Sequence, residues 1–103
     1  MAASNPPTRG EALDFDVSLE DFANPGRFKT DPTLAAGDVK VYKDNGAAAN
    51  IATLPSVSPA GSPVVDGILS ATEMDADKVT VVFHDQTDPP EWADKSFTIL
   101  TSA

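Results

Sequence analysis

The sequence predicts an all-β fold, a small antiparallel β-sandwich, and three observations support this. Six short segments with strand-like patterns follow one another, separated by turn-forming residues. Nine Pro and six Gly interrupt the 103 residues too often for long helices. The length suits one domain with one core. The spacing is that of immunoglobulin-like folds without their Cys pair, and an oligonucleotide-binding type of barrel is the architectural alternative.

We expect a flexible N-terminal arm over residues 1–11 and a single domain over residues 12–103. The arm is polar and is broken by Pro6-Pro7. It is either a frayed terminus or a segment that becomes ordered on a neighbouring subunit.

The first strand is predicted over Ala12–Leu19. Four apolar residues alternate there with Asp and Ser, which gives one buried and one solvated face: Leu13, Phe15, Val17 and Leu19.

The next segment, Glu20–Gly37, has no clear period and contains several turn signals, so it is predicted to be a long loop. We expect Phe22 and Phe28 to pin it to the edge of the core. The loop is either a binding surface or simply packed on its own body.

A hairpin is predicted to follow. Asp38–Asp44 forms one strand, with Val39 and Val41 inward. Asn45-Gly46 favours a type I′ turn. The return strand, Ala47–Thr53, is rich in alanine and is expected to be short or irregular.

A Pro-rich loop leads to a strand over Val64–Leu69. Ser70 and Glu73 then have the spacing of a capping box, which predicts one short helical turn near Ser70–Asp75.

The clearest strand is Lys78–Asp85, with Val79, Val81 and Phe83 on one face. Val82 makes the opposite face partly apolar, as a central strand covered on both sides would explain.

The last strand is predicted over Ser96–Thr101. Phe97 and Ile99 share one face.

The charge balance constrains the partners. Seven Lys and Arg stand against 16 Asp and Glu, a net charge of −9. This excess disfavours nucleic acid and anionic membranes, and it suits solubility or docking on a basic surface. No apolar run approaches the ~18 residues of a membrane span, and the start lacks the apolar core of a secretory signal. We therefore expect the protein to stay in the compartment where it is made.

No catalytic residue and no cofactor are predicted. The absence of Cys and the single His exclude thiolate and multi-imidazole sites. His84 and Asp85 are adjacent on a strand and so point to opposite faces.

No metal site is predicted either. Asp75-Ala76-Asp77 looks like the start of a calcium loop, but Lys78-Val79-Thr80 supplies none of the later ligands. We interpret the segment as a solvated acidic turn.

Trp92, the only Trp, lies in a loop with Asp88-Pro89-Pro90. It either folds back as a lid over the core edge or stacks on a sugar ring or a partner.

Several phrases in order resemble a known family. They are Leu34-Ala35-Ala36-Gly37-Asp38, Lys43-Asp44-Asn45-Gly46, Leu69-Ser70-Ala71-Thr72-Glu73-Met74 and Glu91-Trp92. Together they resemble small β-sandwich virion proteins of tailed bacteriophages over about Phe15 to Thr101.

The resemblance implies a non-enzymatic structural protein of the virion, a decoration, cement or spike-base subunit on the head. It implies contacts with the major capsid protein or with tail and fibre proteins, and a homo-oligomer, with a trimer favoured. A tail, neck, baseplate or fibre-adaptor component is the alternative, as is a carbohydrate-binding attachment module using Trp92. A small hydrolase or metal protein is the third class. As partner contacts we predict residues of the arm and the loops whose side chains are large enough to reach a neighbouring protein: Arg9, Phe22, Arg27, Phe28, Lys29 and Trp92.

Overall fold

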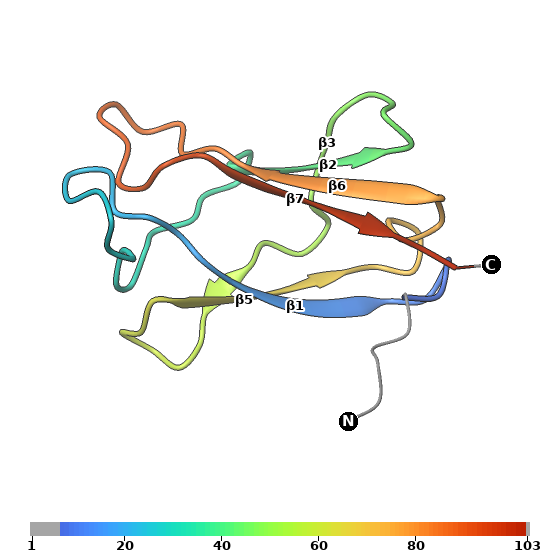
Figure 1. Ribbon diagram of the computed structural model, residues 1–103, viewed down its shortest axis with the longest axis horizontal. Helices are drawn as coiled ribbons and strands as arrows, with labels where there is room; N and C mark the ends of the chain where they lie inside the picture. The colour runs from blue at the N-terminus through green and yellow to red at the C-terminus, as the bar shows by residue number, and fades with distance from the viewer. Residues whose placement is uncertain (1–6, 103) are drawn as a thin grey trace.

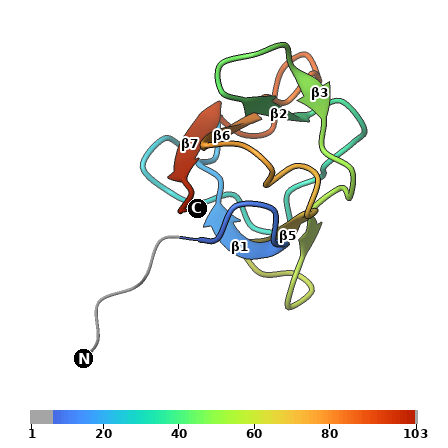
Figure 2. The same ribbon diagram turned by 90° about the vertical axis from the view of Figure 1, so that its right-hand side faces the viewer.

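Two antiparallel sheets face each other in the computed structural model, which describes residues 7–102 (Figures 1 and 2). The first sheet has the order β1-β5-β4, with bounds Leu13–Ser18, Val64–Leu69 and Ser56–Val57. The second has the order β3-β2-β6-β7, with bounds Ala49–Asn50, Val39–Lys43, Lys78–Phe83 and Lys95–Leu100. The described residues contain no helix, and therefore none long and apolar enough to cross a membrane. The predicted all-β sandwich is confirmed.

The inward faces are the ones that the alternating patterns predict. Val39, Val79, Val81 and Phe83 of the second sheet are fully buried, as is Val65 of the first. The ring centroids of Phe15 and Phe97 lie 5.3 Å apart, on the side of the sandwich formed by the edge strands β1 and β7. This aromatic contact joins the two sheets on that side.

Gly67 lies within β5 at a position where the ring of Phe15 occupies the space that a side chain would fill. Phe15 is its partner in the β1–β5 ladder. A Cβ on Gly67 would lie 2.3 Å from Phe15 Cζ. Here the glycine serves close packing of an aromatic ring against a strand.

The hairpin turn lies one residue earlier than predicted. The positive φ angles belong to Asp44 (52°) and Asn45 (62°), and Gly46 N donates to Lys43 O at 2.8 Å. Two hydrogen bonds to Lys78 favour this conformation of Asp44. The Asp44 carboxylate accepts from Lys78 N at 2.9 Å, and Asp44 N donates to Lys78 O at 2.8 Å. The return strand β3 has only two residues, as the alanine-rich sequence predicts.

The capping box is confirmed, although it closes a single turn and no helix follows. Glu73 N donates to Ser70 Oγ at 3.1 Å, and Ser70 N donates to Glu73 Oε1 at 2.8 Å. Met74 N completes the turn by donating to Ser70 O at 3.0 Å. The turn places the Met74 side chain in the core.

β6 is central in its sheet, but its outer face is not covered by any part of residues 7–102. Thr80 and Val82 are half-buried there, and His84 is exposed. The expectation of cover on both sides was wrong, because only the inward side of this sheet meets the other sheet.

The part of the predicted arm that the structure describes, residues 7–11, is attached to the body. Arg9 N donates to Ser102 O and Ser102 N to Pro7 O, each at 2.8 Å. Gly10 N donates to Met74 O at 3.0 Å. Residues 7–11 of the predicted arm are therefore hydrogen-bonded to the domain, and residues 1–6 lie outside the described part of the chain.

Candidate interaction surface

The long loop between β1 and β2 begins with a narrow hairpin-like excursion. Asp21 N donates to Arg27 O and Lys29 N to Leu19 O, both at 2.7 Å. Glu20 and Phe28 form an isolated antiparallel bridge between these bonds. Because its backbone is hydrogen-bonded, the excursion presents its side chains in defined directions.

Two aromatic side chains of this excursion face solvent. Phe22 is 51% exposed and Phe28 is 62% exposed. The expectation that they pin the loop to the core was wrong, since backbone hydrogen bonds do that work. Large exposed rings on a fixed loop are typical of a contact surface, which favours the binding interpretation of the loop.

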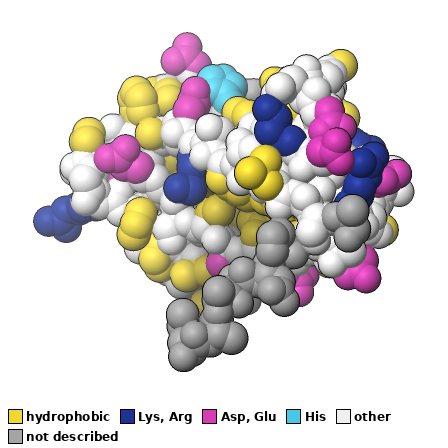
Figure 3. All heavy atoms as spheres, turned by 45° about the vertical axis from the view of Figure 1, so that its right-hand side comes forward, with side chains coloured by type: hydrophobic (Ala, Val, Ile, Leu, Met, Phe, Trp, Pro, Cys, Tyr) yellow, Lys and Arg dark blue, Asp and Glu magenta, His cyan; other side chains and the backbone are white. Residues whose placement is uncertain are grey.

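Phe28 borders a groove formed by two adjoining cavities of about 310 and 520 Å³. Both cavities are lined by Ser18, Phe28 and Lys95, and the larger one reaches Phe15 and Phe97. The groove therefore follows the open side of the sandwich between β1 and β7. Figure 3 shows hydrophobic side chains gathered in a hollow of the surface.

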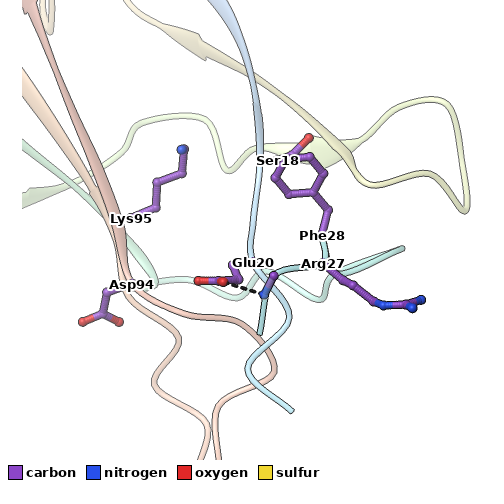
Figure 4. A pocket seen from close by; sticks show the side chains of 7 residues that line it. Ser18, Glu20, Arg27, Phe28, Asp94 and Lys95 are labelled. Carbon is purple, nitrogen blue, oxygen red and sulfur yellow. Dashed lines mark hydrogen bonds between the residues drawn. The ribbon is translucent and has the colours of Figure 1, made fainter. Parts of the chain in front are cut away.

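The charged groups at the smaller cavity differ in how they are engaged (Figure 4). The Glu20 carboxylate accepts from Gly26 N at 2.8 Å, and Asp94 contacts His84 Nδ1 at 2.7 Å. Neither Arg27 nor Lys95 forms a side-chain hydrogen bond or ion pair within residues 7–102. Lys95 thus offers an ammonium group to an incoming molecule, whereas the Arg27 side chain extends away from Lys95 (Figure 4).

Trp92 is buried and was wrongly predicted as a contact residue. Its side chain is 0% exposed, packs edge-on against Phe83 with centroids 6.4 Å apart, and donates from Nε1 to Thr33 O at 3.3 Å. The lid interpretation is confirmed. Stacking on a sugar would require this ring to leave the core, so the fold offers no Trp92 platform for a glycan.

Arg9 was predicted as a partner contact, and its guanidinium is engaged within the chain. Its Nε donates to Asp75 at 3.0 Å and its Nη1 to Asp77 at 2.6 Å. The hydrogen bond that Arg9 donates to Asp75 raises the pKa of Arg9 above its ordinary value, with the charge of Asp77 adding to it. The acidic turn that looked like a calcium loop is therefore occupied by an internal cation.

Lys29, the remaining predicted contact, is half-buried at the base of the same excursion. The structure thus gathers Phe22, Arg27, Phe28 and Lys29 on one loop and separates them from Arg9 and Trp92.

His84 has a carboxylate partner that the sequence did not reveal. Asp94 faces it across the β6–β7 pair, with both side chains more than half exposed. Adjacency in sequence suggested only Asp85, and the register of the two strands is needed to find Asp94.

Asp85 lies on the opposite side, buried, and organises the loop before β7. It accepts from Thr87 N at 2.9 Å and Glu91 N at 2.7 Å. Burial by itself raises the pKa of Asp85, but these two hydrogen bonds, together with the Thr87 side chain and His84, outweigh it, and the net pKa lies below its usual value. This carboxylate supports loop structure.

Within residues 7–102, no three His, Asp or Glu side chains are grouped to hold a metal ion. Comparison with known proteins found no matching family model, no similar curated protein and no similar solved structure. The functional argument therefore depends on this chain's own residues.

Proposed function

We propose that this chain is a non-enzymatic structural protein of a tailed-phage virion, which binds neighbouring virion proteins. Its proposed place is the head, as a decoration, cement or spike-base subunit on the major capsid protein. A tail, neck or baseplate position is the alternative placement. The proposed localisation is accordingly the virion, assembled in the host cytoplasm.

The observation that carries the proposal is the hydrogen-bonded loop with two exposed Phe rings, of which Phe28 borders the groove. A small rigid sandwich spends little conformational entropy when such a loop binds a partner. The order of phrases in the sequence, from Leu34-Ala35-Ala36-Gly37 to Glu91-Trp92, supports the virion context through its resemblance to phage proteins.

Mass spectrometry of purified phage particles tests the proposal directly. We expect peptides of this chain in stoichiometric amount with a capsid or tail protein. Their absence from intact particles would end the virion assignment. Imaging of particles that carry a labelled chain then separates a head position from a tail position.

A substitution in the loop tests whether that surface makes the contact. We expect Phe28→Ser to lower the amount of the chain in particles by about tenfold or more, because an exposed aromatic anchor in an interface contributes about 1.4 kcal/mol or more. Leu54→Ser is the matched control, since Leu54 is also exposed, at 41%, but lines neither cavity of the groove. Equal incorporation of the two variants would remove the loop from the interface.

We further propose a homo-oligomer, with a trimer favoured. Light scattering of the purified chain at several concentrations measures its mass. A single species of one-chain mass at all concentrations would confine any trimer to the assembled particle.

A further inference from the structure

The second sheet has a free edge along β7. On one side β7 pairs with β6, and within residues 7–102 no strand pairs with its other side. Thr101 N donates to Asp77 O on the β6 side, whereas Ser102 N donates to Pro7 O on the other side. Because the N–H and C=O groups of successive strand residues point to opposite edges, three residues present theirs to the free edge: Ser96, Thr98 and Leu100.

The chain itself supplies lateral partners beyond both ends of β7. After β7, Ser102 is bridged in parallel by Thr8. Before β7, Ala93 N donates to Glu20 O at 2.8 Å and Phe22 N to Glu91 O at 3.0 Å. The six residues between, Lys95–Leu100, lack such a partner along ~20 Å of strand. We call this stretch the β7 window.

The β7 window borders the apolar part of the groove. Phe97 and Phe15 are half-buried there and line the cavity of about 520 Å³, and Phe28 forms its border. A strand laid along β7 would project every second side chain toward these rings. Backbone hydrogen bonds and apolar contacts would then act together, as they do when a peptide adds to a sheet.

The charges at one end of the β7 window favour an acidic segment. Lys95 begins the window and Arg27 lies at the adjoining smaller cavity, and both are exposed. Glu20 and Asp94, the acidic residues of that cavity, already have hydrogen-bond partners within the chain. A carboxylate on the incoming segment would find the ammonium group of Lys95, which no described side chain engages.

We propose that the β7 window binds an extended segment of another protein as an added strand, with apolar residues toward Phe15 and Phe97 and an acidic end beside Lys95. The proposal rests on the proposed function in one respect only, that this chain works by holding another polypeptide.

The probe is a short synthetic peptide in which valine and threonine alternate and which ends in two aspartates. A second peptide ends in two lysines instead. Each is titrated into the ¹⁵N-labelled full chain, and amide shifts are followed by NMR. We expect the aspartate peptide to bind saturably, with its largest shifts at Ser96, Thr98 and Leu100. We expect the lysine peptide to bind about tenfold more weakly.

Two variants separate strand addition from adhesion to the apolar groove. Ser96→Pro removes an N–H that points to the free edge and leaves the β6 ladder intact. We expect Ser96→Pro to weaken binding of the aspartate peptide by about tenfold, because one backbone hydrogen bond is lost and the proline ring obstructs the edge of the strand. Ser96→Ala keeps the N–H and should bind like the unchanged chain. Thermal unfolding and far-UV circular dichroism establish that both variants fold.

Several results would overturn the inference: no saturable binding, equal affinity for the two peptides, or full binding by folded Ser96→Pro. Self-association of the chain that Ser96→Pro abolishes would also overturn it, because a second copy would then be the occupant. The chain's presence in particles tests the virion assignment separately, so the two proposals can fail independently.

Discussion

At the scale of single residues, neighbours in space explain the positions that look anomalous in the sequence. Glycine is unfavourable within a strand, yet Gly67 lies opposite Phe15, whose ring occupies the space that a side chain would fill. Asp85 is a buried carboxylate, yet backbone N–H groups of its own loop satisfy it. In both cases a local cost is offset by a specific contact.

The packing of Phe15 on Gly67 predicts that Gly67→Ala destabilises the fold. The added Cβ would lie 2.3 Å from Phe15 Cζ, so the ring must move. We expect a loss of about 1–3 kcal/mol in the free energy of unfolding, measured with urea. Adding Phe15→Leu should make the further effect of Gly67→Ala much smaller, because the ring that clashes is then gone. An unchanged midpoint in Gly67→Ala would contradict this packing.

The hydrogen bonds to Asp85 predict a pH-dependent contribution to stability. Because the pKa of Asp85 is lower in the folded state, its stabilisation is present above the unfolded pKa of about 4 and is lost as the pH falls through the folded pKa. We expect Asp85→Asn to cost about 1–3 kcal/mol at neutral pH. In urea titrations the difference from the unchanged chain should shrink progressively as the pH falls below about 4. A difference that stays constant with pH would show that the charge of Asp85 does not matter.

At the scale of elements, period-two patterns predict strands well, whereas contacts between distant segments are hidden. The inward faces of β1, β2, β6 and β7 follow from alternation alone. The turn after β2 was misplaced by one residue because Lys78, distant in sequence, binds Asp44. A rule based on Asn-Gly cannot include that contact.

At the candidate interaction surface too, contacts between segments distant in sequence could not be predicted. Phe22 and Phe28 were correctly assigned to a long loop, but their exposure depends on backbone hydrogen bonds that the loop donates to the carbonyls of Leu19 and Glu91. Trp92 sits in a loop that the sequence predicts, and only the close approach of Thr33 and Phe83 shows that its ring is buried.

The turn after β5 allows a test of the capping box. Ser70→Ala removes the acceptor of Glu73 N while leaving the Glu73 carboxylate in place. We expect a loss of about 1 kcal/mol in the free energy of unfolding, measured with urea. Thr72→Ala, in the same turn, is the control, because the hydrogen bonds of Thr72 within residues 7–102 involve only its backbone carbonyl. Equal effects of both substitutions would show that the Ser70 cap contributes nothing.

Another prediction for this turn concerns metal. Arg9 already forms ion pairs with both Asp75 and Asp77, so calcium would have to displace an internal cation. We expect the thermal midpoint to be the same with EDTA and with millimolar calcium. A rise with calcium would contradict the interpretation of this turn as a salt-bridged surface feature.

At the scale of the whole molecule, the sandwich combines a net charge of −9 with a local surface of different character. The acidic excess keeps free copies apart and favours partners with basic patches. On the β1 and β7 side, exposed rings, an apolar groove and the cations Arg27 and Lys95 occur together. The acidic excess therefore attracts basic partners over a distance, whereas the β1 and β7 side makes the close contact with a partner.

Cross-linking mass spectrometry on intact phage particles tests the central claim, that this chain holds another virion protein through the surface between β1 and β7. We expect Lys95 and Lys29 to cross-link to a different virion protein, and those cross-links to disappear in particles that lack that protein. Absence of the chain from the particles, or cross-links from Lys95 to its own chain alone, would contradict the account.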